Sequence, residues 1–328
     1  MIHSLYFTAD GQLRLDITED EFRFALQDPG GLLWVDFEAT IPADDEKILT
    51  GVFGFHPLAV DDALQETHVP KVDDWGEYLY IVLSTVRLGV KDGVTLDSQE
   101  LDVFLGKNYM VTHHDQPITA IQRVWSSVQR DDRHLRRGAD HLLYRLVDEV
   151  VSQYMPVVDE IDDEIDSIED EIFNDHGASI LERIFSLKRA VLQLRRFVDP
   201  QREVLNRLAR DDYEVIDSRE RVYFRDVYDH LVRLHDLIES LRDLIGGALD
   251  TYLSVVNNRM NDIMKTLTVI TTLFMPISFV VGFFGMNYFA PVANTGAWTD
   301  VPSLIITLII LVLAPVGMFF WIRRRGWM

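Results

Sequence analysis

A regular series of small and weakly polar residues runs through the apolar segment that follows residue 260. Its members are alternately three and four residues apart, which places them on one face of a helix. These residues, here called the 261–282 stripe, are Asn261, Met264, Thr268, Thr271, Met275, Ser278 and Gly282. Flanking positions such as Val269, Leu273 and Phe279 are larger and apolar. Such a stripe either packs membrane helices together or lines a pore, and two spans per chain enclose a pore only in an oligomer.

The stripe lies in the first of two segments without charge. Neither residues 266–299 nor residues 301–322 contain Asp, Glu, Lys or Arg. A bilayer core needs about 20 apolar residues of helix, so each segment predicts a membrane span. Lys265 precedes the first span and Arg323 to Arg325 follow the second. The positive-inside tendency therefore predicts that both chain ends are cytoplasmic and that residues 287–300 lie outside. We expect a multi-pass protein of the cell (inner) membrane. The first residues lack the pattern of a signal peptide.

The remaining composition excludes several classes of function. Acidic residues outnumber basic ones by 53 to 31 in the 328-residue chain, which gives a formal net charge of −22. A nucleic-acid partner is therefore not expected, because phosphate binding needs clustered Lys and Arg. The absence of cysteine excludes disulfides, thiolate metal sites and Cys nucleophiles. Common phosphate-binding, hydrolase and zinc-protease motifs are also missing, so we do not expect an enzyme.

The first 140 residues have the pattern of a domain that contains both strands and helices. Segments 32–37, 78–88 and 101–114 are rich in β-branched and aromatic residues, and segment 48–64 has helical spacing interrupted by Gly-Phe-His-Pro. We expect an α/β domain of two or three layers. Adjacent residues on a strand point to opposite faces, so His113 and His114 cannot hold one ion together and are expected to be structural.

Helical patterns dominate from about Pro117 onward. An acidic helical segment over 140–172 is followed by a basic one over 180–208, which favours an antiparallel hairpin. Asp217 and Ser218 predict the start of a helix that runs through the first span and is about 100 Å long. We therefore predict an α+β membrane protein whose long stalk helix continues into the first of two C-terminal transmembrane helices. The expected regions are 1–140 (α/β domain), 141–216 (helical hairpin), 217–286 (stalk and first span), 287–300 (external loop), 301–322 (second span) and 323–328 (basic tail).

The first span ends in the tripeptide Gly285-Met286-Asn287, within the sequence FFGMNY. In this the chain resembles the CorA family of divalent-cation channels, whose signature is a Gly-Met-Asn tripeptide at the end of the first of two C-terminal membrane helices. The resemblance extends over nearly the whole chain. It includes HPLAVDDAL (56–64), RLVDEVV (145–151), EIDDEID (160–166), YFRDVYDH (223–230) and MKTLTVITTLFMP (264–276).

The resemblance implies a homopentamer in the lipid bilayer that conducts Mg²⁺, and also Co²⁺ or Ni²⁺, through a pore lined by the first span. Gly285, Met286 and Asn287 would form the selectivity filter, in which a ring of Asn287 amide oxygens holds the hydrated ion. Asn261 would form a second polar ring. The constrictions that gate by dewetting would be Met264, Leu267 and Met275. Leu267 is one residue off the strict spacing, so its role rests on the resemblance alone.

The resemblance also implies closure by intracellular Mg²⁺ bound between subunits. The matching carboxylates are Asp62 with Asp250 and, more loosely, Asp61, Asp148 and Asp226. Opposed carboxylates repel when empty and are joined by a bridging divalent ion. Asp226 and Asp250 are about 36 Å apart on a straight helix, although Asp61 and Asp62 are adjacent. The five therefore form one compact site only if the helix bends or tilts, for example near Gly246-Gly247.

Two alternatives remain open from the sequence. The external segment FAPVANTGAWTDVPS has Asp300 as its only acid, whereas many relatives carry an acidic segment there. A Zn²⁺ transporter of the same family is therefore an alternative, although the Met of the tripeptide favours Mg²⁺. Outside this class, the chain could be a membrane-anchored coiled-coil scaffold, but such anchors need neither the 261–282 stripe nor the tripeptide.

Overall fold

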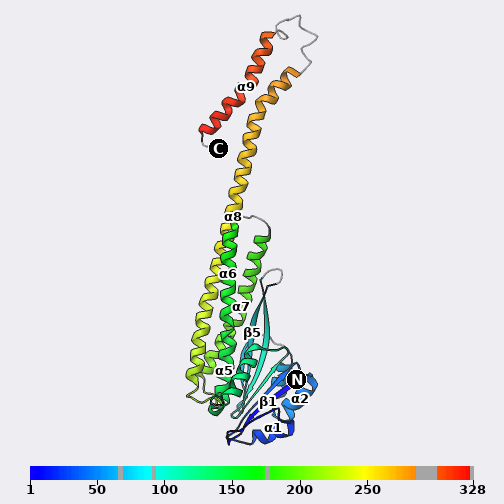
Figure 1. Ribbon diagram of the computed structural model, residues 1–328, viewed down its shortest axis with the longest axis vertical. Helices are drawn as coiled ribbons and strands as arrows, with labels where there is room; N and C mark the ends of the chain where they lie inside the picture. The colour runs from blue at the N-terminus through cyan, green and yellow to red at the C-terminus, as the bar shows by residue number, and fades with distance from the viewer. Residues whose placement is uncertain (66–68, 91–93, 174–177, 286–300, 326–328) are drawn as a thin grey trace. The chain divides into compact units, whose positions relative to one another are not determined.

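The computed structural model describes residues 1–65, 69–90, 94–173, 178–285 and 301–325 (Figure 1). The chain divides into two compact units, residues 1–249 and residues 250–328. The predicted α+β membrane-protein architecture is confirmed, with an N-terminal sheet domain and a long helix that leads to a C-terminal apolar helix.

The first unit is built on a seven-stranded sheet with the order β2-β1-β3-β7-β6-β5-β4. Its strands are β1 (Ile2–Phe7), β2 (Leu13–Leu15), β3 (Leu32–Glu38), β4 (Lys71–Asp74), β5 (Leu79–Val90), β6 (Val94–Leu105) and β7 (Tyr109–His114). The central pair β3 and β7 is parallel, and the other neighbouring strands of the sheet pair antiparallel. Strand β3 is apolar at five of its seven positions because helices cover both of its faces.

Helices form a layer on each face of the sheet, so the domain has three layers (Figure 1). One layer consists of α1 (Glu19–Leu26), α2 (Pro42–Gly51) and α3 (Pro57–Leu64). Alternate β3 residues, Leu33 and Val35 among them, face this layer, where Phe55 stacks on Phe104 with ring centroids 4.2 Å apart. Trp34 points to the other face and packs on Trp125, 4.6 Å away.

The opposite layer consists of four helices. They are α4 (Thr119–Arg130), α5 (Ala139–Ser152), α6 (Tyr154–Ile172) and α7 (Ala178–Arg210), with a 3-10 turn (Leu135–Arg137) before α5. Because α5, α6 and α7 contact the sheet, the helices expected over 141–216 form one compact unit with it.

Helices α6 and α7 form the predicted hairpin, and its seam is mainly apolar. Four isoleucines of α6 are buried: Ile161, Ile165, Ile168 and Ile172. Arg183 of α7 donates to Glu164 at 2.9 Å and also pairs with Glu171. Partly exposed ion pairs contribute about 0–1 kcal/mol each, whereas burial of an isoleucine contributes about 1.5–3 kcal/mol. The charge complementarity therefore adds less to the hairpin than its apolar seam.

Three predicted element boundaries differ in the structure. The strand-like segment 101–114 splits into β6 and β7 at Gly106, where a Cβ atom would lie 2.2 Å from the Tyr109 ring, so only glycine fits this turn. The helical segment 140–172 is divided at Gln153 into α5 and α6. The long helix begins at Arg221, because the Asp217 carboxylate accepts the Arg219 N–H at 2.8 Å and caps a turn before it.

Helix α8 (Arg221–Gly285) has 65 residues, or about 100 Å at 1.5 Å per residue. It continues as one helix through Gly246, Gly247 and Pro276. Helix α9 (Val301–Arg324) follows in the second unit. Both helices contain a segment long and apolar enough to cross a bilayer, in agreement with the two predicted spans.

Candidate ion pathway and metal-binding residues

Every residue of the 261–282 stripe is exposed in the single chain. Other positions of the same segment are partly covered or buried and lie on the opposite side of α8. They are Val269, Thr272, Leu273, Pro276, Ile277 and Val280. The covered side of the apolar part of α8 is thus mostly large and apolar, whereas its exposed positions include the stripe together with large residues such as Leu267, Phe274 and Phe279.

Two hydroxyl groups of the stripe, those of Thr268 and Thr271, are arranged as acceptors. The Thr268 hydroxyl donates to the Met264 carbonyl at 2.8 Å, and the Thr271 hydroxyl donates to the Leu267 carbonyl at 2.8 Å. A hydroxyl whose proton is used inside the helix keeps its lone pairs for outside partners. The stripe therefore presents neutral oxygen acceptors, which suit a cation or the water molecules around it.

Large apolar side chains interrupt these oxygens. The side chains expected to form the constrictions, those of Met264, Leu267 and Met275, are all more than half exposed. Gly285 is the last residue of α8. Met286 and Asn287, the rest of the predicted selectivity filter, lie outside the described residues, as does the external segment up to residue 300.

The predicted regulatory carboxylates are spread over three helices. Asp61 and Asp62 lie on α3, where Asp61 accepts a hydrogen bond from Gln65 at 2.7 Å. Asp62 pairs with Lys71, whose ammonium group also lies 3.0 Å from Asp73. Burial lowers the pKa of Lys71, but hydrogen bonds to the two aspartates outweigh it and the pKa rises. A metal ion at Asp62 would thus compete with a charged lysine.

The structure brings together Asp148 of α5 and Asp226 of α8. Burial raises the pKa of Asp148, and the nearby negative charge of Asp226 raises it further. Arg145, 3.7 Å from the Asp148 carboxylate, and His230 act in the opposite direction. A divalent cation would relieve the repulsion between these two carboxylates.

The five aspartates do not form one cluster within the chain. Asp61 lies in the α1–α3 layer, whereas Asp148 lies in the layer on the opposite face of the sheet. Asp250 is exposed on α8 and belongs to the second unit. The structure thus supports Asp148 with Asp226 as neighbours, and the role of Asp62 with Asp250 stays a prediction.

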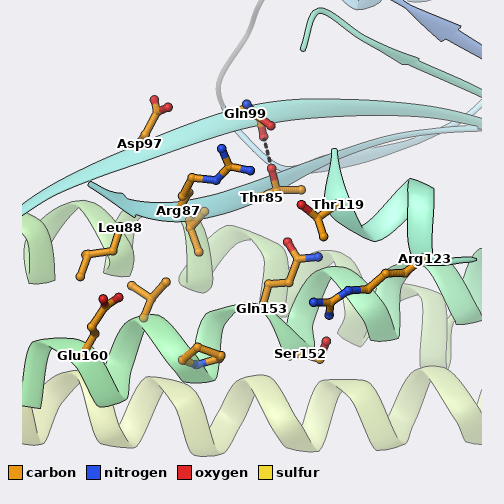
Figure 2. A pocket seen from close by; sticks show the side chains of 13 residues that line it. Thr85, Arg87, Leu88, Asp97, Gln99, Thr119, Arg123, Ser152, Gln153 and Glu160 are labelled. Atoms are coloured by element: carbon orange, nitrogen blue, oxygen red, sulfur yellow. Dashed lines mark hydrogen bonds between the residues drawn. The ribbon is translucent and has the colours of Figure 1, made fainter. Parts of the chain in front are cut away.

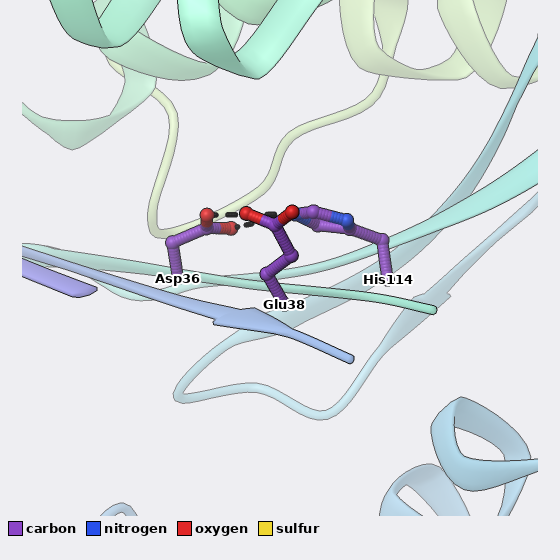
Figure 3. Close-up of side chains that lie close together, drawn as sticks. All are labelled: Asp36, Glu38 and His114. Carbon is purple, nitrogen blue, oxygen red and sulfur yellow. Dashed lines mark hydrogen bonds and ion pairs between the residues drawn. The ribbon is translucent and has the colours of Figure 1, made fainter. Parts of the chain in front are cut away.

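A further group of possible metal ligands was missed by the sequence reasoning. Asp36 and Glu38 of β3 and His114 of β7 present ligand atoms that all lie within 4.8 Å of one another (Figure 3). Asp36 and Glu38 are two apart on a strand, a spacing that places both on one face. The parallel pairing of β3 with β7, which joins His114 to them, has no signal in the sequence.

His113 and His114 face opposite sides of the sheet, as predicted. His113 lies 3.6 Å from Asp45 and 3.9 Å from Asp102, whereas His114 lies 3.2 Å from Asp36. Burial opposes protonation of His113, but hydrogen bonds to Asp102 and Asp45 raise its pKa to about 9. His113 is thus a buried ion-pair residue of the α2 side.

A separate pocket of about 300 Å³ lies between the β5–β6 pair and helices α4 to α6 (Figure 2). Its wall mixes charges of both signs, which come from Arg87, Arg123, Asp97 and Glu160. Arg123 already pairs with Glu149 at 2.8 Å. This mixed and partly neutralised wall favours no particular ligand.

Comparisons with known proteins agree with these features. The family described as CorA-like Mg²⁺ transporter protein matches residues 29–324. The cobalt/magnesium transport protein CorA of Thermotoga maritima is 34% identical over 300 residues, which cover 85% of this chain and 84% of that protein. The putative metal ion transporter YfjQ of Bacillus subtilis is 33% identical over 297 residues, or 90% and 89% of the two chains.

The fold of the chain agrees with that of a solved structure of this family as well. The complete structure of the CorA magnesium transporter from Methanocaldococcus jannaschii superposes with a TM-score of 0.81 at 22% identity, and covers 99% of this chain and 98% of that one. Members of this family are transporters, which agrees with the expectation that the chain is not an enzyme. The match over most of its length shows that the chain belongs to the CorA-like Mg²⁺ transporter protein family.

Proposed function

We propose that this protein is a homopentameric channel that admits Mg²⁺, and also Co²⁺ or Ni²⁺, through the cell (inner) membrane. The observation that carries the proposal is the exposed 261–282 stripe on a membrane-length helix of a CorA-family chain. In a pentamer the five stripes would face one another around the axis, and the covered side of α8 would face outward. The family relative from Thermotoga maritima, named a cobalt/magnesium transport protein, supports the choice of ion.

The chemistry of the stripe suits a hydrated cation that must also leave. Mg²⁺ gives up its water reluctantly, so neutral oxygens from Thr268 and Thr271 would contact its water shell. The absence of a carboxylate between residues 266 and 299 keeps binding weak enough for conduction. At the outer end, a ring of Asn287 amides would select the ion, with Gly285 and Met286 placing them. Asn261 would form the ring at the inner end.

In this proposal, the gate consists of three apolar side chains on α8. Met264, Leu267 and Met275 of five subunits would narrow the pore and exclude water when the subunits approach one another. Intracellular Mg²⁺ would favour this closed arrangement by bridging carboxylates between subunits. Asp62 with Asp250 is the first candidate bridge, and Asp148 with Asp226 and Asp61 is the second.

The lysine at Asp62 fits a regulatory role. Lys71 pairs with Asp62 when no metal is bound. A bridging Mg²⁺ would have to displace this ammonium, which weakens the site. A weak site suits a sensor of intracellular Mg²⁺, because it would empty when the ion becomes scarce.

Ion uptake into liposomes by the purified protein tests the function. Mg²⁺, Co²⁺ and Zn²⁺ uptake is measured under an inside-negative potential, with and without a proton gradient, and protein-free liposomes serve as the control. We expect Mg²⁺ and Co²⁺ uptake that follows the potential and needs no proton gradient. Zn²⁺ uptake that requires the proton gradient would instead indicate the zinc-transporting alternative. No uptake of any ion by correctly inserted protein would indicate the scaffold.

A further inference from the structure

Asp36, Glu38 and His114 converge on one face of the sheet, toward the α4–α5 layer (Figure 3). In the parallel β3–β7 pair, Asp36 is opposite Thr112 and Glu38 is opposite His114. Asp36 and His114 are each 3% exposed, whereas Glu38 is half-buried. Two ligands are therefore held inside the domain, and the third lies at its edge.

Buried neighbours fix the two inner ligands. The Nδ1 atom of His114 lies 2.7 Å from the Gln116 carbonyl oxygen, which can only accept a hydrogen bond. Nδ1 must therefore carry the proton, and Nε2 is the atom that faces the carboxylates. This arrangement is typical of a metal-ligating histidine, whose second nitrogen donates to a carbonyl or carboxylate.

Asp36 is held in a similar way. The Thr112 hydroxyl donates to Asp36, and the Trp34 indole N–H donates to the Thr112 oxygen at 3.0 Å. The Nε2 atom of His114 then lies 3.2 and 3.4 Å from the two Asp36 oxygens. When the ring is neutral and its proton is on Nδ1, the Nε2 atom is an acceptor, as are both carboxylate oxygens of Asp36. The contact is therefore favourable only with a cation between them, either a proton on Nε2 or a metal ion.

The remaining side of the cluster is open. Among the residues that the structure describes, the Glu38 carboxylate has no hydrogen-bond or ion-pair partner, although Glu38 lines a pocket of about 290 Å³ with Asp36 and His114. Ile121 and Trp125 of α4 form the opposite wall of this pocket. A metal ion could thus enter from this side and keep one or more water ligands.

We propose that Asp36, Glu38 and His114 bind a transition-metal dication of the Co²⁺ or Zn²⁺ class, in preference to Mg²⁺. One imidazole nitrogen with two carboxylates suits Co²⁺, Ni²⁺ or Zn²⁺, whereas Mg²⁺ takes oxygen ligands in an octahedral shell. The site goes beyond the proposed transport, because it lies in the sheet domain and shares no residue with the 261–282 stripe. It gives the chain a means of distinguishing Co²⁺ or Zn²⁺ from Mg²⁺.

Co²⁺ binding to the full chain in detergent tests the site. Metal-free protein is dialysed against Co²⁺ in the presence of a large excess of Mg²⁺, which occupies sites made only of oxygen ligands. Bound Co²⁺ is counted by elemental analysis, and its visible absorption reports nitrogen ligation. We expect one such Co²⁺ per chain in the parent, loss of this ion in His114→Gln, and affinity at least about tenfold weaker in Glu38→Gln.

The neighbouring histidine supplies the matched control. His113→Gln changes the same residue type on the same strand, but on the opposite face, and is expected to retain the Co²⁺. Circular dichroism checks the fold of each variant, and Glu38→Gln keeps the test valid if the buried His114 variant unfolds, because Glu38 is half-buried. Equal Co²⁺ binding in the parent and Glu38→Gln, or displacement of the ion by excess Mg²⁺, would overturn the proposal. These binding results do not depend on whether the protein conducts ions.

Discussion

At the scale of single residues, the buried charges of the sheet domain act in small separate groups. His113 pairs with Asp45 and Asp102 on one face of the sheet, and His114 pairs with Asp36 on the other. Each group faces its own layer of helices. One strand thus supplies a structural ion pair and a candidate metal ligand at adjacent positions.

A third group of titratable side chains, near the start of α5, should make the stability of the fold depend on pH. The Nδ1 atom of His134 lies 3.1 Å from Nε2 of His141, whose Nδ1 lies 2.9 Å from Glu220. Burial lowers the pKa of both histidines, although the Glu220 carboxylate partly offsets this for His141. Because both folded pKa values lie below the unfolded value of about 6.5, the unfolded chain takes up protons first as the pH falls. Their stabilisation is therefore present above pH 6.5 and lost below it.

Thermal unfolding between pH 5 and 8 measures this effect. We expect Tm to fall below about pH 6.5, by about 2–4 °C for each kcal/mol lost, and His134→Asn to flatten the profile. The control is His56→Asn, which replaces an exposed helix-capping residue by another good cap. A His134→Asn profile as steep as that of the parent would show that other groups cause the pH dependence.

At the scale of elements, periodicity predicted the helices and the interfaces that they form. The stripe spacing placed seven residues on one face of α8, and the α6–α7 hairpin followed from its apolar and charged repeats. The β3–β7 pairing could not be predicted, because the two strands are far apart in sequence and register has no local signal. For this reason the Asp36 cluster was missed, although its member His114 and the adjacent His113 were both noticed.

The apolar side chains expected to form the constrictions give a prediction about conduction. Met275→Ser and Leu267→Ser should each raise ion flux in liposomes, because a hydroxyl makes the constriction easier to wet. Ile270→Ser is the matched control, since Ile270 is also exposed on α8 but lies off the stripe. Flux equal to the parent in both variants would mean that the stripe packs helices and does not line a pore.

At the scale of the whole molecule, the proposed regulation would have to connect the sheet domain with the membrane helices. Helix α8 is the continuous element that belongs to both units. An ion that bridges subunits through Asp62 and Asp250 would therefore act directly on the helix that carries the 261–282 stripe. Such a ligand stabilises the closed state by mass action, without a change of fold.

Replacing both carboxylates tests this bridge. Asp62→Asn with Asp250→Asn should fold normally, lose most of the Mg²⁺-dependent rise in Tm and protection from proteolysis, and conduct at internal Mg²⁺ levels that silence the parent. Each single replacement should have a smaller effect, because one carboxylate still attracts the ion. Asp73→Asn with Asp243→Asn is the control, since Asp73 shares Lys71 with Asp62 and Asp243 is also on α8. Unchanged Mg²⁺-dependent protection in the Asp62→Asn, Asp250→Asn variant would mean that any gating metal binds to other residues.

The most direct test of the central claim is ion flux through the Asn287→Ala variant. Mg²⁺ uptake into liposomes is measured for the parent, for Asn287→Ala and for the control Asn294→Ala, and the mass of each detergent-solubilised oligomer is determined. If Asn287 amides hold the hydrated ion at the pore mouth, Asn287→Ala stays pentameric and loses uptake, whereas Asn294→Ala conducts like the parent. Normal Mg²⁺ uptake by correctly inserted Asn287→Ala would contradict the proposed pathway.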